Sequence, residues 1–150
     1  MQGYDDQIMV RVIITLVLFH IAFRDLQERK IGKVETGSLI LLGLAHGMAW
    51  TDSLAGGILC AALPEIINFA VFRLDGLGGG DIRMMFAAGW ILGADAGLYA
   101  LLLSGILVLA FFAIRSFAEK KRYVDWKRYV DWRFPLAPFL SLGIMVFLWR

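Results

Sequence analysis

The sequence is poor in the residues that build disulfides or bind metal ions. It has one cysteine, Cys60, inside an apolar run, which excludes a disulfide framework and a pair of zinc-binding cysteines. It has two histidines, and His46 has no matching partner ligand. Charged residues make up only 19% of the 150 residues and fall in short islands. No metal site is therefore implied.

What remains is largely apolar, with 59% hydrophobic residues, and this composition favours a membrane protein. A spanning helix needs about 20 mostly apolar residues. The second apolar run, residues 38–50, becomes long enough if its helix starts near Val34. We predict an all-α integral membrane protein with a single domain over residues 1–150 and about six transmembrane helices. The six apolar runs are residues 8–23, 38–50, 53–72, 84–93, 96–114 and 134–149.

The first apolar run reads as a retained helix. An acidic stretch, "YDDQ", precedes it in place of a basic segment, and no small-residue cleavage site follows it. We therefore expect no cleavable signal peptide.

The placement of the basic residues predicts the topology. If the N-terminus is outside, the inside loops are residues 24–35, 73–83 and 115–133, and they hold thirteen of the fifteen Lys and Arg residues. This asymmetry follows the positive-inside rule. Without a fourth spanning helix, the basic loop 115–133 would lie outside. We predict a multi-pass protein of the cytoplasmic (inner) membrane, with its functional site at the cytoplasmic face.

One internal repeat, "KRYVDWKRYVDW", occupies residues 121–132. Its Tyr, Trp, Lys and Arg side chains suit a segment at the membrane surface. A local duplication in a tolerant loop is the simpler interpretation.

Among the aspartates on the predicted inside face, Asp25 ends the first helix, and Asp75 and Asp81 flank a glycine run. When two carboxylates approach closely, repulsion keeps one of them protonated, and the pair can then perform acid–base catalysis. The alternative is that Asp25 and Asp81 are ordinary charges at the membrane edge, paired with Arg24 and Arg83.

The glycine run "GLGGGD" ends at Asp81 and has four glycines in five residues. It lacks the last glycine and the preceding strand of a dinucleotide fingerprint, and no GK[ST] follows as in a P-loop. It also differs from the spaced small residues of helix packing. Such a run suits a backbone that must bend, or accept a peptide substrate close by, next to a carboxylate.

These residues resemble a known family. "GGGD", residues 78–81, is similar to the GxGD motif of the membrane aspartyl proteases, above all the type IV prepilin peptidases and the archaeal preflagellin peptidases. Two further elements agree in order and spacing. "DLQERKIGK" places Asp25 and Ile31 as in the D-x5-I-P-N pattern of the family, and "PLAPF" resembles the start of its last helix.

The resemblance implies an aspartyl endopeptidase with Asp25 and Asp81 as the catalytic pair. Its substrates would be prepilin-like membrane proteins, whose leader peptide is cut at the cytoplasmic face. Neither a nucleic acid nor a cofactor is implied. The residues expected to shape the substrate-binding loop are Gly78, Gly79, Gly80, Arg83 and Ile31.

The chain also departs from the family pattern. Gly32 and Lys33 stand where Pro-Asn is usual, and Arg83 stands where Lys is usual. The chain lacks the cysteine pairs of the methyltransferase region of larger members, so we do not expect N-methylation of the product.

A few other polar residues lie near the predicted site. Glu65 and Asn68 in the third run either line the approach to the aspartates or hydrogen-bond between helices. His20 lies about one turn before Asp25, and Asp75 is the rival of Asp81 for the second catalytic position.

Three alternative functions stay open at this point. The first is a protease of the same chemistry with another substrate, such as an archaeal preflagellin. The second is a catalytically silent membrane scaffold of a pilus or secretion machine. The third is a small transporter with Glu65 and the aspartates as a proton path, although no inverted repeat is visible.

Overall fold

The computed structural model describes residues 2–46, 49–67, 69–70, 78–118 and 136–150. Within these ranges the chain forms six α-helices and no β-strand, so the all-α prediction is confirmed for this part of the chain. Asn68, Asp75, Pro135 and the repeat at residues 121–132 lie outside the described residues. The helices are α1 (Gln2–Glu28), α2 (Lys33–Ala45), α3 (Trp50–Ile67), α4 (Gly79–Leu92), α5 (Ala94–Ala118) and α7 (Ala137–Leu148).

Each helix contains most of one apolar run, and its ends follow local chemistry. α4 begins inside the glycine run, with Gly78 as its N-cap. It ends at Gly93, whose φ of 80° is a left-handed conformation that glycine adopts without steric cost. This glycine lets the chain reverse at once into α5. Pro138 lies in the first turn of α7. A backbone N–H at this position would have no partner within the helix, so the N–H that proline lacks is not missed.

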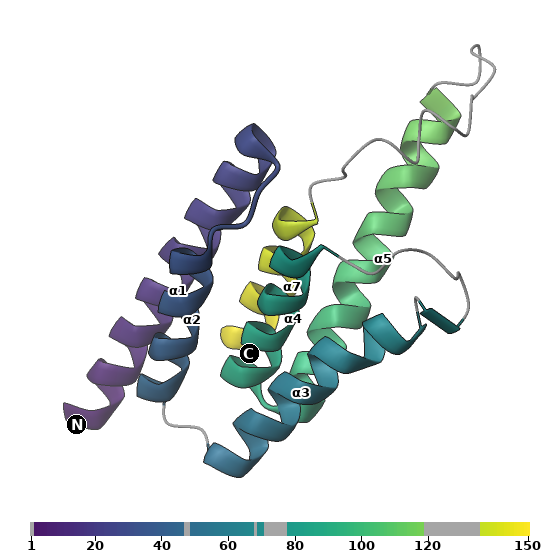
Figure 1. The fold of residues 1–150 in the computed structure, drawn as a ribbon. Helices are drawn as coiled ribbons and strands as arrows, with labels where there is room; N and C mark the ends of the chain where they lie inside the picture. Colours follow the sequence, from purple (N-terminus) through teal and green to yellow (C-terminus); the bar gives the residue numbers. More distant parts are fainter. Residues whose placement is uncertain (1, 47–48, 68, 71–77, 119–135) are drawn as a thin grey trace.

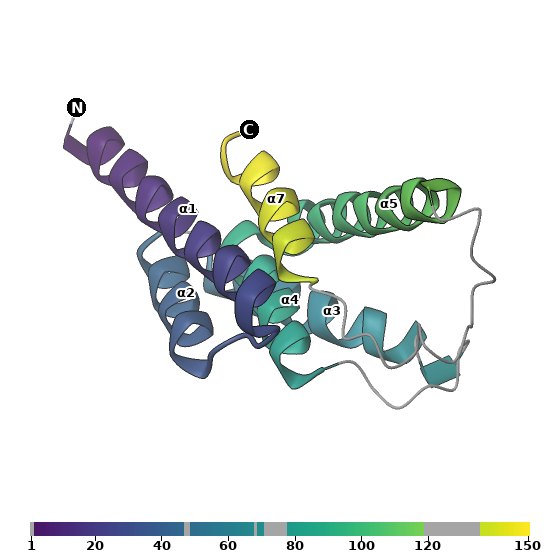
Figure 2. The same ribbon diagram turned by 90° about the horizontal axis from the view of Figure 1, so that it is seen from above.

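The helices run alternately up and down, and α4 lies in the middle of the bundle (Figure 1). α4 packs against α2, α3, α5 and α7, and eight of its 14 residues are buried. Viewed from above, α1 and α2 lie to one side of α4 and α7, and α3 and α5 lie to the other (Figure 2). The central helix is therefore the element that ties the two sides together.

Small residues let the backbones of α3, α4 and α5 come close to one another. A Cβ atom added at Gly56 would lie 2.5 Å from the carbonyl oxygen of Gly89. A Cβ atom added at Gly97 would lie 2.8 Å from Cα of Gly89. Such contacts are typical of helices that pack by close approach rather than by large side chains.

The outer surface of the bundle is strongly apolar. Two helical segments, Asp5–Glu28 and Ala94–Arg115, are long and apolar enough to cross a membrane. Only 17% of the most apolar window of each is buried, which differs from the buried core helix of a water-soluble protein. Phe19 is 68% exposed and Leu109 is 70% exposed. Apolar exposure on this scale is what a lipid-facing surface requires.

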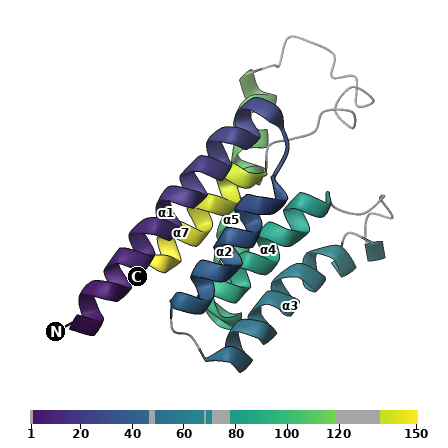
Figure 3. The same ribbon diagram turned by 60° about the vertical axis from the view of Figure 1, so that its left-hand side comes forward.

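The end of α1 and the starts of α4 and α7 lie at the same end of the bundle (Figures 1 and 3). The two chain termini lie toward the opposite end. Alternation of the helices thus brings together segments that are more than a hundred residues apart in the sequence.

Candidate active site

Asp25 lies in the last turns of α1 and is buried, with 5% of its surface exposed. Its Oδ2 atom accepts a hydrogen bond of 3.1 Å from the backbone N–H of Ala137, the first residue of α7. A helix N-terminus has unsatisfied N–H groups and the positive end of the helix dipole. Burial raises the pKa of the Asp25 carboxyl, and the N–H at the start of α7 opposes that rise by stabilising the negative charge.

Asp81 lies in the first turn of α4, ahead of the apolar run that begins at Met84. The N–H of Asp81 donates to the carbonyl oxygen of Gly78 at 2.9 Å, which closes the first turn. Burial raises the pKa of Asp81 to about 6, and the negative charge of Asp25 contributes to the same shift. Asp81 consequently keeps its proton far closer to neutral pH than an ordinary aspartate does.

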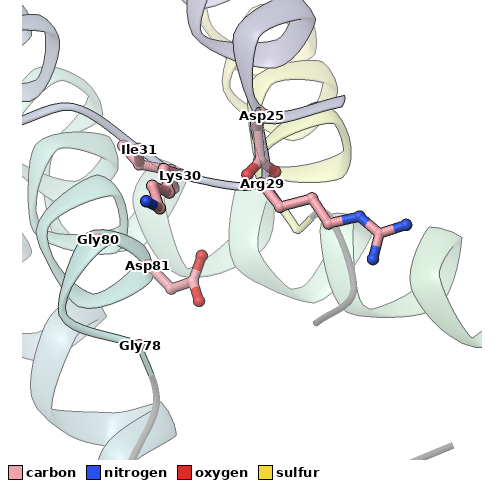
Figure 4. A pocket seen from close by; sticks show the side chains of 7 residues that line it. All are labelled: Asp25, Arg29, Lys30, Ile31, Gly78, Gly80 and Asp81. Carbon is pink, nitrogen blue, oxygen red and sulfur yellow. The ribbon is translucent and has the colours of Figure 1, made fainter. Parts of the chain in front are cut away.

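The two carboxylates share one cavity of about 620 Å³. They come from different helices and point into the same space, whereas the side chain of Arg29 extends away from Asp81 (Figure 4). The cavity is lined by Asp25, Arg29, Lys30, Ile31, Gly78, Gly80 and Asp81.

Gly80 and Ile31 bring the first turn of α4 against the loop between α1 and α2. A Cβ atom added at Gly80 would lie 3.0 Å from Cβ of Ile31, so the absence of a side chain at residue 80 permits this contact. At Gly79 an added Cβ atom would meet nothing within 4 Å. Gly79 and the exposed Arg83 do not line the cavity.

Arg24 does not serve as the counter-ion of Asp25. Its Nη2 atom pairs with Glu28 at 3.0 Å, and its Nη1 atom pairs with Glu35 in the first turn of α2. The pairing with Glu35 connects α1 to α2 on either side of the loop that carries Ile31. Arg24 therefore helps to hold that loop, and Asp25 accepts its hydrogen bond from the N–H of Ala137 instead.

Two further predicted residues, Glu65 and His20, do not line the cavity. Glu65 is half-buried on α3, and His20 is exposed on α1. No group of three or more His, Cys, Asp or Glu side chains in the described part of the chain could hold a metal ion.

Three contributors to the site were not predicted from the sequence. Arg29 and Lys30 line the cavity, and they directly precede Ile31 in the stretch that gave Asp25. Arg29 has a φ of 53°, which turns the chain sharply after α1 and carries Lys30 and Ile31 toward α4. The third contributor is the backbone N–H of Ala137, which lies within the "PLAPF" stretch.

This arrangement has the elements of carboxylate acid–base chemistry. One acid, Asp25, accepts a backbone hydrogen bond that favours its charged form. The other, Asp81, has a pKa raised to about 6 and can donate a proton. A space large enough for a peptide segment and a water molecule adjoins both of them.

A known protein family matches most of the chain. The model of the type IV leader peptidase family matches residues 12–113, which is more than half of the chain. The matched segment contains Asp25, Ile31 and the glycines up to Asp81. No curated protein and no solved structure gave a significant match.

Proposed function

Because the chain belongs to the type IV leader peptidase family, a family of proteases, we propose that it is a membrane-embedded aspartyl endopeptidase. Asp25 and Asp81 form its catalytic pair. The observation that carries the proposal is the meeting of these two carboxylates, one from α1 and one from α4, in a single cavity.

The two aspartates have different starting roles. Asp81, with its pKa raised to about 6, holds the proton shared by the pair and donates it toward the carbonyl oxygen of the scissile peptide bond. Asp25, stabilised in its charged form by the N–H of Ala137, accepts a proton from the attacking water. The roles exchange when the tetrahedral intermediate breaks down and the leaving amine takes a proton. The pair titrates as a unit.

The proposed substrate is a prepilin-like protein with a short basic leader ahead of a hydrophobic helix. The cavity lies at the end of the bundle that carries the basic segment 24–35, which the positive-inside rule assigns to the cytoplasm. Cleavage just before the hydrophobic helix would take place at this face. Gly78, Gly80 and Ile31, which line the cavity, shape the space in which the scissile segment lies.

The test is processing of a co-expressed prepilin by Asp25→Asn and Asp81→Asn variants. Each substitution keeps the size of the side chain and removes its acid–base chemistry, so we expect cleavage to fall by about 100-fold or more. The matched control is Asp95→Asn, which changes an exposed aspartate in the first turn of α5, at the far end of α4 from the cavity. Immunoblots of the membrane fraction would report both the product and the amount of inserted protease.

Full activity in either cavity variant would refute the mechanism. If Asp75→Asn were inactive and Asp81→Asn active, the second catalytic aspartate would be Asp75. Parallel assays with a preflagellin and a prepilin would separate the two substrate classes, because the chemistry at the cavity is the same for both.

A further inference from the structure

Gly32 is a glycine at a position where the backbone does not require one. It is the N-cap of α2, with φ of −72° and ψ of 148°, and this is extended backbone that any residue adopts. A Cβ atom added at Gly32 would lie 2.5 Å from the carboxyl carbon of Glu35, and closer still to Oε2 of the same carboxylate. The carboxylate of Glu35 therefore occupies the space that a side chain at residue 32 would fill.

Glu35 is held in this place from two sides. It is the third residue of α2, a position from which a carboxylate can reach back over the N-cap of its helix. Its pKa is lowered, chiefly by a hydrogen bond from its own backbone N–H and further by Arg24 of α1. The ion pair joins Nη1 of Arg24 to Oε1 of Glu35. A pair at the edge of the bundle contributes little to global stability, so its consequence lies in the position of the chain between its two members.

That chain segment is the loop that forms one wall of the aspartate cavity. Arg24 lies near the end of α1 and Glu35 in the first turn of α2, so the ion pair joins the two ends of loop 29–32. Ile31 in this loop lines the cavity, and Figure 4 shows it beside Gly80 at the start of α4. A Cβ atom added at Gly80 would lie only 3.0 Å from Cβ of Ile31. A loop held at both ends keeps Ile31 against the first turn of α4.

Building on the function proposed above, we propose that Arg24, Glu35 and Gly32 are positioning residues of the protease. Their ion pair, with its carboxylate in the space left by Gly32, closes the wall of the cavity beside Asp81. When the pair is broken, the loop moves away from α4 and water gains access to Asp81. Burial is the main cause of the raised pKa of Asp81, so access of water lowers that pKa and the proton is lost at neutral pH.

The ionisable surroundings of Asp81 are unchanged when this ion pair is broken. Among the described residues, the charged groups that line the cavity with Asp81 are Asp25 on α1 and Arg29 and Lys30 in the loop. No charged residue of α2, α3, α5 or α7 in the described ranges lines it. A shift in the titration of Asp81 after substitution of Glu35 would therefore report a movement of the loop rather than the removal of a charge from the cavity.

The first measurement is hydrogen–deuterium exchange of the purified full chain in detergent, which needs no substrate. Glu35→Gln removes the charge of the pair. In Gly32→Ala the new methyl group displaces the carboxylate of Glu35 from Arg24, and the variant should fold because the displaced atoms are the flexible end of a side chain. We expect backbone amides of residues 29–32 and 80–82 to exchange several times faster in both variants than in the wild type.

Two control variants make the same chemical changes away from the loop. Glu28→Gln removes the other partner of Arg24, which lies at 3.0 Å on the same helix and does not connect α1 to α2. Gly37→Ala adds a methyl group on α2 where nothing lies within 4 Å. We expect both controls to exchange like the wild type and to cleave a prepilin at the wild-type rate.

The second measurement is prepilin cleavage between pH 5 and pH 8. We expect Glu35→Gln and Gly32→Ala to lower kcat/KM by about 10-fold at pH 7, because a small displacement at a catalytic site is costly. The loss should be smaller at pH 5.5, where Asp81 keeps its proton. The double variant should be no worse than the more affected single variant, because both changes break one contact. A loss of folded protein alone would lower the rate by the same factor at every pH.

Unchanged exchange at residues 29–32 in both Glu35→Gln and Gly32→Ala would overturn the proposal, whether or not the protein cleaves a prepilin. A loss of cleavage that is the same at every pH, or that is equally large in Glu28→Gln, would also overturn it. If the wild type cleaved no prepilin while both loop variants exchanged faster, the result would count against the protease function. That result would still support the ion pair as the closure of the cavity wall.

Discussion

At the scale of the residue, two side chains of the same type differ because their surroundings differ. Burial raises the pKa of Asp25, and a backbone N–H from the start of another helix opposes that rise. For Asp81, burial and then the charge of Asp25 raise the pKa to about 6, and no opposing contribution accompanies them. This difference between neighbouring environments is what separates an acid from a base in a carboxylate pair.

The raised pKa of Asp81 makes a prediction about stability. The folded state holds its proton up to about pH 6, whereas an unfolded aspartate loses it near pH 3.9. Between these values the folded state binds more protons, so the free energy of unfolding falls as pH rises. Asp81→Asn removes this titration. We expect the variant to gain in unfolding midpoint relative to wild type as the pH rises from 4 to 7, with no further gain above that range.

The measurement is thermal unfolding in detergent across this pH range, with Asp95→Asn as the control. Asp95 is exposed at the start of α5, so its replacement should leave the pH profile close to that of the wild type. A difference between Asp81→Asn and wild type that did not change with pH would contradict the assigned pKa.

At the scale of the element, α4 combines two requirements in 14 residues. Its first turn must expose Gly78, Gly80 and Asp81 to the cavity, and its later turns must pack against four other helices. Glycine serves both ends of the helix. Gly80 makes room for Ile31, and Gly89 lets the backbone of α3 come close at Gly56.

The contact between α3 and α4 predicts that alanine substitution changes stability differently at two glycines. In Gly56→Ala the new methyl group would lie 2.5 Å from a backbone oxygen of α4, and a backbone atom cannot rotate away. We expect a loss of about 1–3 kcal/mol in unfolding free energy. Gly105→Ala on α5 meets nothing within 4 Å and gains helix propensity of up to about 1 kcal/mol.

Unfolding of the two variants in denaturant, under identical detergent conditions, would compare them directly. If Gly56→Ala were as stable as Gly105→Ala, the close approach of α3 and α4 would be wrong. Loss of stability in Gly105→Ala would show instead that this face of α5 is covered in the membrane.

At the scale of the whole molecule, alternation of the helices decides which segments meet. The loop after α1, the start of α4 and the start of α7 lie at one end of the bundle (Figure 1). The same end carries the basic segment that follows α1, and the opposite end carries Asp52 and Asp95 at the starts of α3 and α5. This asymmetry predicts which end faces the cytoplasm.

Cysteine labelling in whole cells tests this orientation. In a Cys60→Ser background, Lys30→Cys and Asp95→Cys would each carry a single exposed thiol. We expect a membrane-impermeant maleimide to label Asp95→Cys in intact cells, and to label Lys30→Cys only after the cells are opened. The reverse pattern would place the aspartate cavity outside and would exclude cleavage at the cytoplasmic face.

Much of the candidate site could be foreseen because its residues fall in short, distinctive stretches. The run "GGGD" marked Asp81, and the spacing in "DLQERKIGK" marked Asp25 and Ile31. Lys30 was missed because nothing in a basic loop distinguishes a cation that lines a cavity from one that faces solvent. Glu65 and His20 were named as possible neighbours of the site from their positions along single helices, and neither lines the cavity.

The sequence by itself determined that the chain is helical, where its apolar runs lie and which end of each run carries positive charge. These properties follow from composition and periodicity, and they need no knowledge of neighbouring helices. The tertiary structure alone decided the partner of each group. Asp25 is held by Ala137, 112 residues away, and Arg24 pairs with Glu35 rather than with Asp25. The physical reason is that burial and hydrogen bonding depend on how helices pack side by side, and the pattern along one helix does not specify which neighbour covers it.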